Sequence, residues 1–169
     1  PTIKKMTQAG GKLNYQKAKK VNDSLQLKGV DFYTMYGQTE ATARISYLPC
    51  GNIDEKPNSI GIPIPGGKLW LEDEKGSKIS DSMVVGELIF EGANVSMGYA
   101  ESINDLSSED VNKGILRTGD LAYFDEDGYY FIEGRNNHFI KVFGNRISLD
   151  SLEKLITTKG FDSVATGVD

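Results

Sequence analysis

The chain has 169 residues, enough for one ordinary domain with a sizeable core and too few for two full domains. Hydrophobic residues make up 38% of it and charged residues 25%, which is typical of a soluble globular protein. The formal net charge of -5 argues against a general nucleic-acid binder, because phosphate backbones require a basic face.

The sequence also gives expectations about membrane, compartment and completeness. No apolar run approaches the roughly 18 residues of a membrane span, and the N-terminus has no signal-peptide core. The single cysteine, Cys50, excludes an internal disulfide and fits a reducing compartment, so we expect a cytoplasmic protein. The chain starts without Met in a strand-like segment and stops after a second one, residues 162–169, so we expect a piece of a longer protein.

The first third of the chain has the pattern of an α/β sheet. Residues 3–8 predict a strand and Gly10-Gly11 a turn. A helix is predicted over residues 13–28, where apolar residues recur at near-helical spacing, and Gly29 ends it. A second strand is predicted over residues 30–36. Strand, helix and strand in this order indicate a βαβ unit.

From Ser59 onwards, short alternating runs punctuated by Gly and Pro predict antiparallel β structure, as a small barrel or a curled sheet. Residues 72–76 (EDEKG) and 125–128 (DEDG) are typical of hairpin turns. A polar break at residues 135–138 is the candidate domain boundary. A strand at 139–144 and a helix from Leu149 to about Thr158, with Ser148 as its N-cap, follow it.

Three short segments combine residues that can bind a nucleotide. The first is YGQTE, from Tyr36 to Glu40, directly after a predicted strand. A hydroxyl and a carboxylate at the carboxyl end of a parallel strand lie where open α/β sheets bind ligands, and Mg²⁺ prefers carboxylate oxygen. The alternative is a helix start with Thr39 as the N-cap. On this stretch alone, the helix start is favoured over a ligand site.

The second segment is LRTGDL, Leu116 to Leu121, where Asp120 follows Gly119 at a predicted turn into a strand. An ionised carboxylate can accept two hydrogen bonds and so suits the paired hydroxyls of a ribose. The alternative is an ordinary turn aspartate. The third segment starts at Gly134 and places three cations around a glycine-containing turn, namely Arg135, Lys141 and Arg146. These cations suit phosphate or ribose oxygens, and the alternative is a solvated basic face.

The order of these motifs resembles that of the adenylate-forming (AMP-binding) superfamily. A Gly-Gly turn, YGQTE, GELIFEGANVSMGY, LRTGDL and GRNNHFIKVFGNRIS follow one another from Gly10 to the end of the chain. The superfamily includes acyl-CoA synthetases, adenylation domains of nonribosomal peptide synthetases, and luciferases. The resemblance implies ATP-dependent activation of a small carboxylic acid to an acyl-adenylate, with Mg²⁺, and transfer to CoA or to the phosphopantetheine of a carrier protein.

The resemblance also implies a domain organisation. Residues 1–58 would end the α/β subdomain of a large N-terminal domain, and residues 59–134 would form its β-rich, barrel-like subdomain. Residues 135–138 would be the hinge, and residues 139–169 the start of a small α+β C-terminal domain.

By the same resemblance, a set of residues would bind the nucleotide: Gly11, Lys12, Tyr36, Gly37, Gln38, Thr39, Asp120, Ile132, Arg135 and Arg146. Gly11 and Lys12 would line the adenine pocket, and Tyr36 would stack on the base. Asp120 would hold the ribose, helped by Arg135, with Ile132 under the nucleoside.

The resemblance assigns the catalytic roles to Thr39, Glu40 and Lys141. Thr39 would contact phosphate, and Glu40 would hold Mg²⁺. Lys141 would serve the second half-reaction, and Gly144 would line the thiol channel. Asn137 would be the hinge pivot, where the family has Asp or Lys.

Two parts of the family's machinery lie outside these 169 residues: a Ser/Thr/Gly-rich phosphate loop and a later lysine. We therefore expect the chain alone to bind nucleotide weakly at best and not to catalyse adenylation. Gln38 favours acyl-CoA synthetases over peptide-synthetase domains, and the small residues 41–43 do not decide the size of the acid. The alternatives are a non-catalytic nucleotide-binding or scaffold module of the same fold, and an unrelated β-rich domain with chance motifs.

Overall fold

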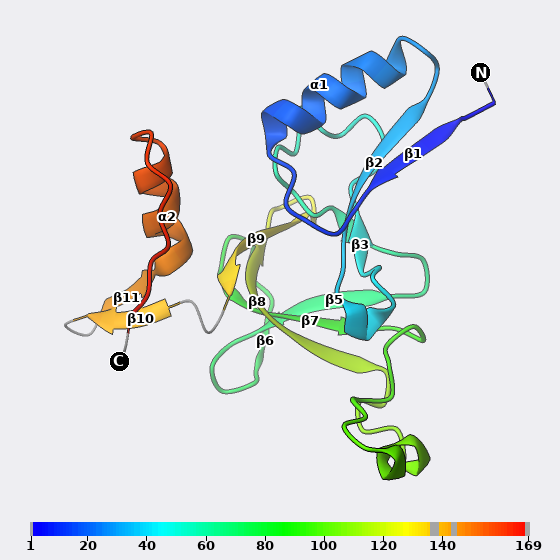
Figure 1. The fold of residues 1–169 in the computed structure, drawn as a ribbon, viewed down its shortest axis with the longest axis vertical. Helices are drawn as coiled ribbons and strands as arrows, with labels where there is room; N and C mark the ends of the chain where they lie inside the picture. The colour runs from blue at the N-terminus through cyan, green and yellow to red at the C-terminus, as the bar shows by residue number, and fades with distance from the viewer. Residues whose placement is uncertain (1, 136–138, 143–144, 168–169) are drawn as a thin grey trace.

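The computed structural model describes residues 2–135, 139–142 and 145–167 (Figure 1). Its first part is a βαβ unit in which β1 (Lys5–Gln8) and β2 (Asp31–Tyr36) pair in parallel across α1 (Tyr15–Gln26). Asn14 caps α1, since its side-chain oxygen accepts a hydrogen bond of 2.9 Å from the Lys17 amide. The predicted βαβ unit is therefore confirmed.

The first sheet continues beyond this unit in the order β1-β2-β3-β4, with β3 (Ser46–Tyr47) and β4 (Ile62–Pro63) antiparallel to their neighbours. Helix α1 covers one face of the β1–β2 pair (Figure 1). A small core joins helix and sheet, and its buried members are Ala18, Phe32, Leu48 and Ile53.

The second sheet is antiparallel throughout, in the order β6-β5-β7-β8-β9. Its strands are β5 (Lys68–Glu72), β6 (Lys78–Ile79), β7 (Gly86–Glu91), β8 (Ile115–Phe124) and β9 (Tyr130–Arg135). Both predicted hairpins are present, because β5 pairs with β6 and β8 pairs with β9. Among the described residues β6 and β9 are the edges of an open sheet, so the curled sheet and not a closed barrel forms.

The two sheets are joined at the segment before β4. The Ile60 amide donates to the Tyr130 carbonyl at 2.9 Å, and the Tyr130 amide donates to the Gly61 carbonyl at 3.0 Å. Tyr36, at the end of β2, packs against the buried core of the second sheet, formed by Leu71, Leu88 and Ala122. The end of β2 therefore lies at the junction of the two sheets.

Two local interpretations of the motifs are wrong. Thr39 is not an N-cap: it begins the short 3₁₀ helix η1 (Thr39–Ala41), and the preceding residue, Gln38, occupies the cap position without a side-chain cap bond. Asp120 is not in a turn, because it lies inside the ten-residue strand β8. The pairing of β7 with β8 shifts register between Glu87 and Ile89, and Gly119 has a φ of 68°, so a β-bulge replaces the predicted turn.

The last part consists of an antiparallel hairpin, β10 (Phe139–Val142) and β11 (Asn145–Ser148), and helix α2 (Leu149–Thr157). The predicted strand and helix are present here. The strand-like segment expected at residues 162–169 is not a strand in its described part, because residues 161–167 have no regular secondary structure. In the part of the chain that the structure describes, no helix is long and apolar enough to cross a membrane.

Candidate nucleotide site

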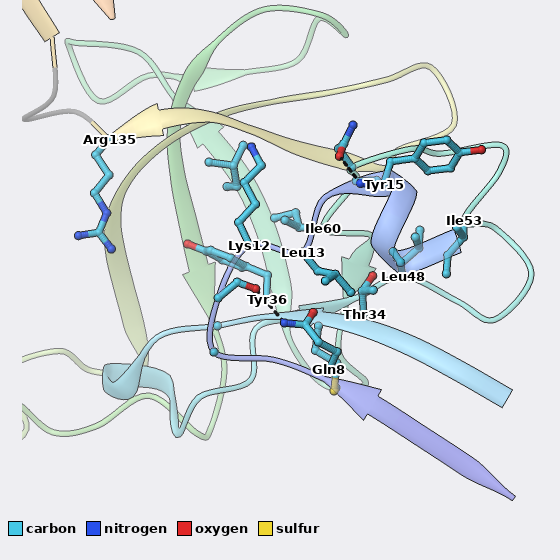
Figure 2. A pocket seen from close by; sticks show the side chains of 18 residues that line it. Gln8, Lys12, Leu13, Tyr15, Thr34, Tyr36, Leu48, Ile53, Ile60 and Arg135 are labelled. Carbon is cyan, nitrogen blue, oxygen red and sulfur yellow. Dashed lines mark hydrogen bonds between the residues drawn. The ribbon is translucent and has the colours of Figure 1, made fainter. Parts of the chain in front are cut away.

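A cavity of about 330 Å³ opens between the loop after β1, the start of α1, the end of β2 and strand β9. Figure 2 shows Arg135 toward one end of this cavity and Tyr15 and Ile53 toward the other, with Tyr36 and Lys12 between them. Its walls contain several residues that the resemblance assigns to a nucleotide, namely Gly11, Lys12, Tyr36, Gly37, Ile132 and Arg135.

The loop that carries Gly11 and Lys12 is held against the sheet by a local contact. The side-chain Nε2 of Gln8 donates to the Gly11 carbonyl at 2.8 Å. The inner end of the cavity is largely apolar, with Leu13, Leu48 and Ile60 in its wall. A planar aromatic ring beside an apolar wall is suited to a flat heterocycle such as a purine base.

A hydrogen-bonded cluster joins YGQTE to LRTGDL. The Tyr36 hydroxyl donates to Oδ2 of Asp120 at 2.5 Å, and Nε2 of Gln38 donates to the same oxygen at 3.0 Å. Nε2 of Gln38 also donates to the Thr118 carbonyl at 2.8 Å. Nε of Arg135 lies 3.3 Å from Oδ1 of Asp120. Residues from three separated motifs therefore meet at one carboxylate.

The β-bulge explains why Asp120 can face Tyr36. Three residues of β8, Thr118 to Asp120, lie opposite the single residue Leu88 of β7, so the Asp120 side chain is aimed differently from that in a regular strand. The Thr118 hydroxyl reinforces the bulge, since it donates to the Leu88 carbonyl at 2.7 Å and accepts from the Asp120 amide at 3.1 Å.

Burial sets the protonation of Tyr36 in this cluster. Asp120 is only 5% exposed, whereas the side chain of Arg135, which pairs with its Oδ1, is 62% exposed. Burial, together with the negative charge of Asp120, raises the pKa of Tyr36 well above its usual range. Tyr36 therefore stays protonated and acts as a donor at neutral pH.

A second cavity, of about 870 Å³, adjoins the first, and Gly10, Gly37 and Arg135 line both. Its wall contains Gln38, Thr39, Glu40, Arg44 and Thr118. The Tyr99 hydroxyl donates to Oε1 of Glu40. This bond is the main cause that lowers the pKa of Glu40, and the positive charge of Arg135 adds to it. Glu40 is therefore ionised at neutral pH.

An ionised carboxylate fits a hard cation, but Glu40 does not form a complete metal site. Among the described residues, no group of three or more His, Cys, Asp or Glu side chains is placed to hold a metal ion. A cation at Glu40 would take most of its oxygen ligands from water or from a bound phosphate.

The remaining predicted residues belong to the last part of the chain. Lys141 is the backbone partner of Arg146 in the register of β10 and β11. Asn137 and Gly144 lie outside the described residues.

Sequence reasoning missed several residues around the site. Asn94 and Tyr99 both contact the segment 39–44, and both lie in GANVSMGY, which was noted as a motif without a role for any side chain. Their residue types in that motif were the available signal. Arg44 lies only four residues beyond Glu40, yet no pattern in the sequence marked it as part of a cavity wall.

The fold is of the adenylate-forming type. The family model described as "AMP-binding enzyme" matches residues 1–100. The chain is 31% identical over 158 residues to 4-hydroxybutyrate--CoA ligase 1 of Metallosphaera sedula, covering 91% of this chain and 27% of that protein. It is 32% identical over 129 residues to 2-succinylbenzoate--CoA ligase of Bacillus cytotoxicus, covering 76% of this chain and 26% of that protein.

Among solved structures, O-succinylbenzoate Coenzyme A Synthetase from Bacillus subtilis, in complex with ATP and magnesium ion, aligns with a TM-score of 0.71 and 26% identity. The alignment covers 95% of this chain and 32% of that one. The chain belongs to the AMP-binding enzyme family. It spans about a quarter of the length of the two curated relatives.

Proposed function

We propose that this chain is part of an enzyme that uses ATP to activate a small carboxylic acid as an acyl-adenylate and then transfers the acyl group to a thiol. The observation that carries the proposal is the meeting of Tyr36, Gln38 and Arg135 at Asp120, beside a cavity lined by the Gly11–Lys12 loop. CoA is the favoured thiol, because the two relatives are named CoA ligases. The phosphopantetheine of a carrier protein is the other candidate.

In this proposal the first cavity takes the nucleoside. Tyr36 stacks on the adenine, Gly11 and Lys12 line its edge, and Ile132 packs beneath the nucleoside. Oδ2 of Asp120 is fixed by its two donors, so Oδ1, which pairs with Arg135, is the oxygen left for a ribose hydroxyl.

The second cavity takes the phosphates and the cation. Thr39 contacts phosphate and Glu40 ligates Mg²⁺, which neutralises phosphate charge when bound. Attack of the acid on the α-phosphate needs charge stabilisation more than covalent help, and Arg135 supplies positive charge at this wall.

The last part of the chain serves the second step. We propose residues 135–138 as the hinge with Asn137 as its pivot, between the large domain, 1–58 and 59–134, and the small one, 139–169. Lys141 acts in thioester formation, Gly144 lines the thiol channel, and Arg146 reaches the nucleotide phosphates. A cytoplasmic location fits this chemistry.

The chain alone is not proposed to be active, because its 169 residues contain neither the phosphate loop nor the later lysine. A pyrophosphate-exchange assay with a panel of carboxylic acids tests this: we expect no turnover by the chain. For the complete protein we expect acid-dependent release of pyrophosphate and AMP, with release of AMP rising when CoA is added. Nucleotide binding without turnover by the complete protein would favour the scaffold alternative.

A further inference from the structure

The loop between β2 and β3, which carries Thr39 and Glu40, has an unfavourable backbone conformation directly after η1. After η1, Thr42 has a φ of 49° and Ala43 a φ of 61°, two consecutive non-glycine residues in the left-handed region. Each such residue costs about 1–2 kcal/mol relative to the right-handed region. Contacts from elsewhere in the structure must therefore hold this loop in place.

The main contacts come from a single side chain, that of Asn94. Its Nδ2 donates to the Ala41 carbonyl at 2.6 Å and to the Arg44 carbonyl at 2.8 Å. These carbonyls flank Thr42 and Ala43, so one amide group bridges the two ends of the left-handed pair. Both N–H donors of this amide are used, and no other side-chain type of similar size presents two donors at this spacing without a charge.

The backbone next to Asn94 adds a second anchor. The Ser96 amide donates to the Glu40 carbonyl at 2.7 Å. Val95 of the same segment packs against the buried cluster of Ala41, Ile45, Phe90 and Leu116, of which Phe90 and Leu116 belong to the second sheet. The loop is thus attached to the segment that follows β7.

We propose that Asn94 is a positioning residue that fixes the backbone of the loop 39–44, and so the phosphate and cation contacts of Thr39 and Glu40. This inference rests on the proposed function of the second cavity. The hydrogen bonds of the Asn94 side chain go to the loop, whereas the Tyr36 hydroxyl is held separately by Asp120. Loss of Asn94 therefore weakens the contacts to phosphate and cation and leaves the nucleoside contacts unchanged.

The first arm of the test uses the chain without ligand. In Asn94→Ala and Asn94→Asp we expect amide hydrogen exchange of Ala43, Arg44 and Ser96 to speed up at least about tenfold, because two hydrogen bonds are lost. The Leu48 amide, bonded to the Thr34 carbonyl, is the internal control and should not change. Asn104→Ala, an exposed asparagine of η2 (Ile103–Ser107), is the matched control variant.

The second arm uses NMR titration with adenosine and with ATP in the presence of Mg²⁺. We expect the apparent Kd for Mg²⁺·ATP to rise about tenfold in both Asn94 variants, with that for adenosine unchanged. A general folding defect would raise both values equally and would overturn the inference. Unchanged exchange of Ala43 and Arg44 would also overturn it, whatever the nucleotide result.

The two proposals fail in distinguishable ways. If the wild-type chain binds neither ligand, nucleotide binding by the chain is contradicted. The exchange arm then still decides whether Asn94 fixes the loop.

Discussion

The Tyr36 hydroxyl donates a 2.5 Å hydrogen bond to Asp120, a residue 84 positions further along the chain. Tyr36 ends β2 of the first sheet and Asp120 lies in β8 of the second, so this bond ties the two sheets together beside the candidate nucleotide site. Because Asp120 is buried, each donor to its carboxylate contributes to the stability of the fold.

Tyr36→Phe separates the hydroxyl of this residue from its ring. The variant keeps the apolar ring and removes one donor from a buried carboxylate, so we expect the free energy of unfolding to fall by about 1–3 kcal/mol. Adenosine affinity should change less than about twofold, because stacking depends on the ring. Tyr36→Ala should lower both the free energy of unfolding and the affinity for adenosine. Urea denaturation and NMR titration measure the two effects.

Tyr47→Phe is the control for the loss of a tyrosine hydroxyl, since Tyr47 lies in the same sheet and outside the Asp120 cluster. If Tyr36→Phe lowered adenosine affinity as much as Tyr36→Ala, the assignment of the ring as the base platform would be wrong.

Gly37, the glycine of YGQTE, is required by close packing of the backbone. A Cβ built on Gly37 would lie 2.5 Å from the carbonyl carbon and oxygen of Ala43. Gly37→Ala should therefore displace the loop that follows it and lower the free energy of unfolding by about 2 kcal/mol or more. Gly11→Ala is the matched control, because a Cβ there meets nothing within 4 Å, and we expect a change within about 0.5 kcal/mol.

Guanidinium denaturation of both glycine variants, with the amide shift of Ala43 as a local probe, tests this steric explanation. Equal stability of Gly37→Ala and wild type would show that the Ala43 backbone can shift to accommodate a Cβ, and would contradict the steric explanation.

The local patterns of the sequence predicted the regular elements well. The βαβ unit and the two hairpins follow from apolar periodicity and turn residues within short windows, and the structure has all of them. The β-bulge at Gly119 did not follow, because "TGD" is equally typical of a turn. Only the pairing of β8 with β7 distinguishes the two.

The residues that support the site were harder to find, because their contacts join distant segments. Asn94 contacts a carbonyl 53 residues away, and Tyr99 contacts Glu40 across 59 residues. No periodicity in a single sequence carries that information. The family resemblance supplied the partners of Tyr36, but it said nothing of side chains that act on the backbone of another loop.

The buried carboxylate of Glu72 predicts an acid-sensitive fold. Nε1 of Trp70 donates to Oε1 of Glu72 at 2.8 Å, and Arg117 pairs with its other oxygen. The hydrogen bond from Trp70, helped by Arg117, lowers the pKa of Glu72 from its ordinary value of 4.5. The stabilisation is therefore fully present above about pH 4.5 and is lost as the pH falls through the lower folded-state pKa.

Urea denaturation between pH 3 and pH 7 measures this effect. We expect Glu72→Gln to be less stable than wild type at pH 7 by about 1–3 kcal/mol and to lose less stability toward pH 3. Glu109→Gln, at an exposed position, is the control. Parallel pH profiles for wild type and Glu72→Gln would exclude Glu72 as a source of the acid sensitivity.

Glu40 offers the most direct test of the cation site. Glu40→Gln keeps an oxygen that can accept from the Tyr99 hydroxyl, so the fold should be unchanged, but it removes the charge that a hard cation requires. We expect Mg²⁺ to strengthen ATP binding to wild type about tenfold and to leave ATP binding to Glu40→Gln unchanged, with adenosine affinity equal in the two proteins. Glu101 is an exposed carboxylate between Tyr99 and η2, so Glu101→Gln controls for the loss of one negative charge.

NMR titrations with ATP at fixed Mg²⁺ concentrations measure the difference in Mg²⁺ dependence between wild type and the variants. If Mg²⁺ strengthened ATP binding to Glu40→Gln as much as to wild type, the cation would have other ligands than Glu40. If Glu101→Gln lost the Mg²⁺ effect to the same extent as Glu40→Gln, the cause would be the change in net charge.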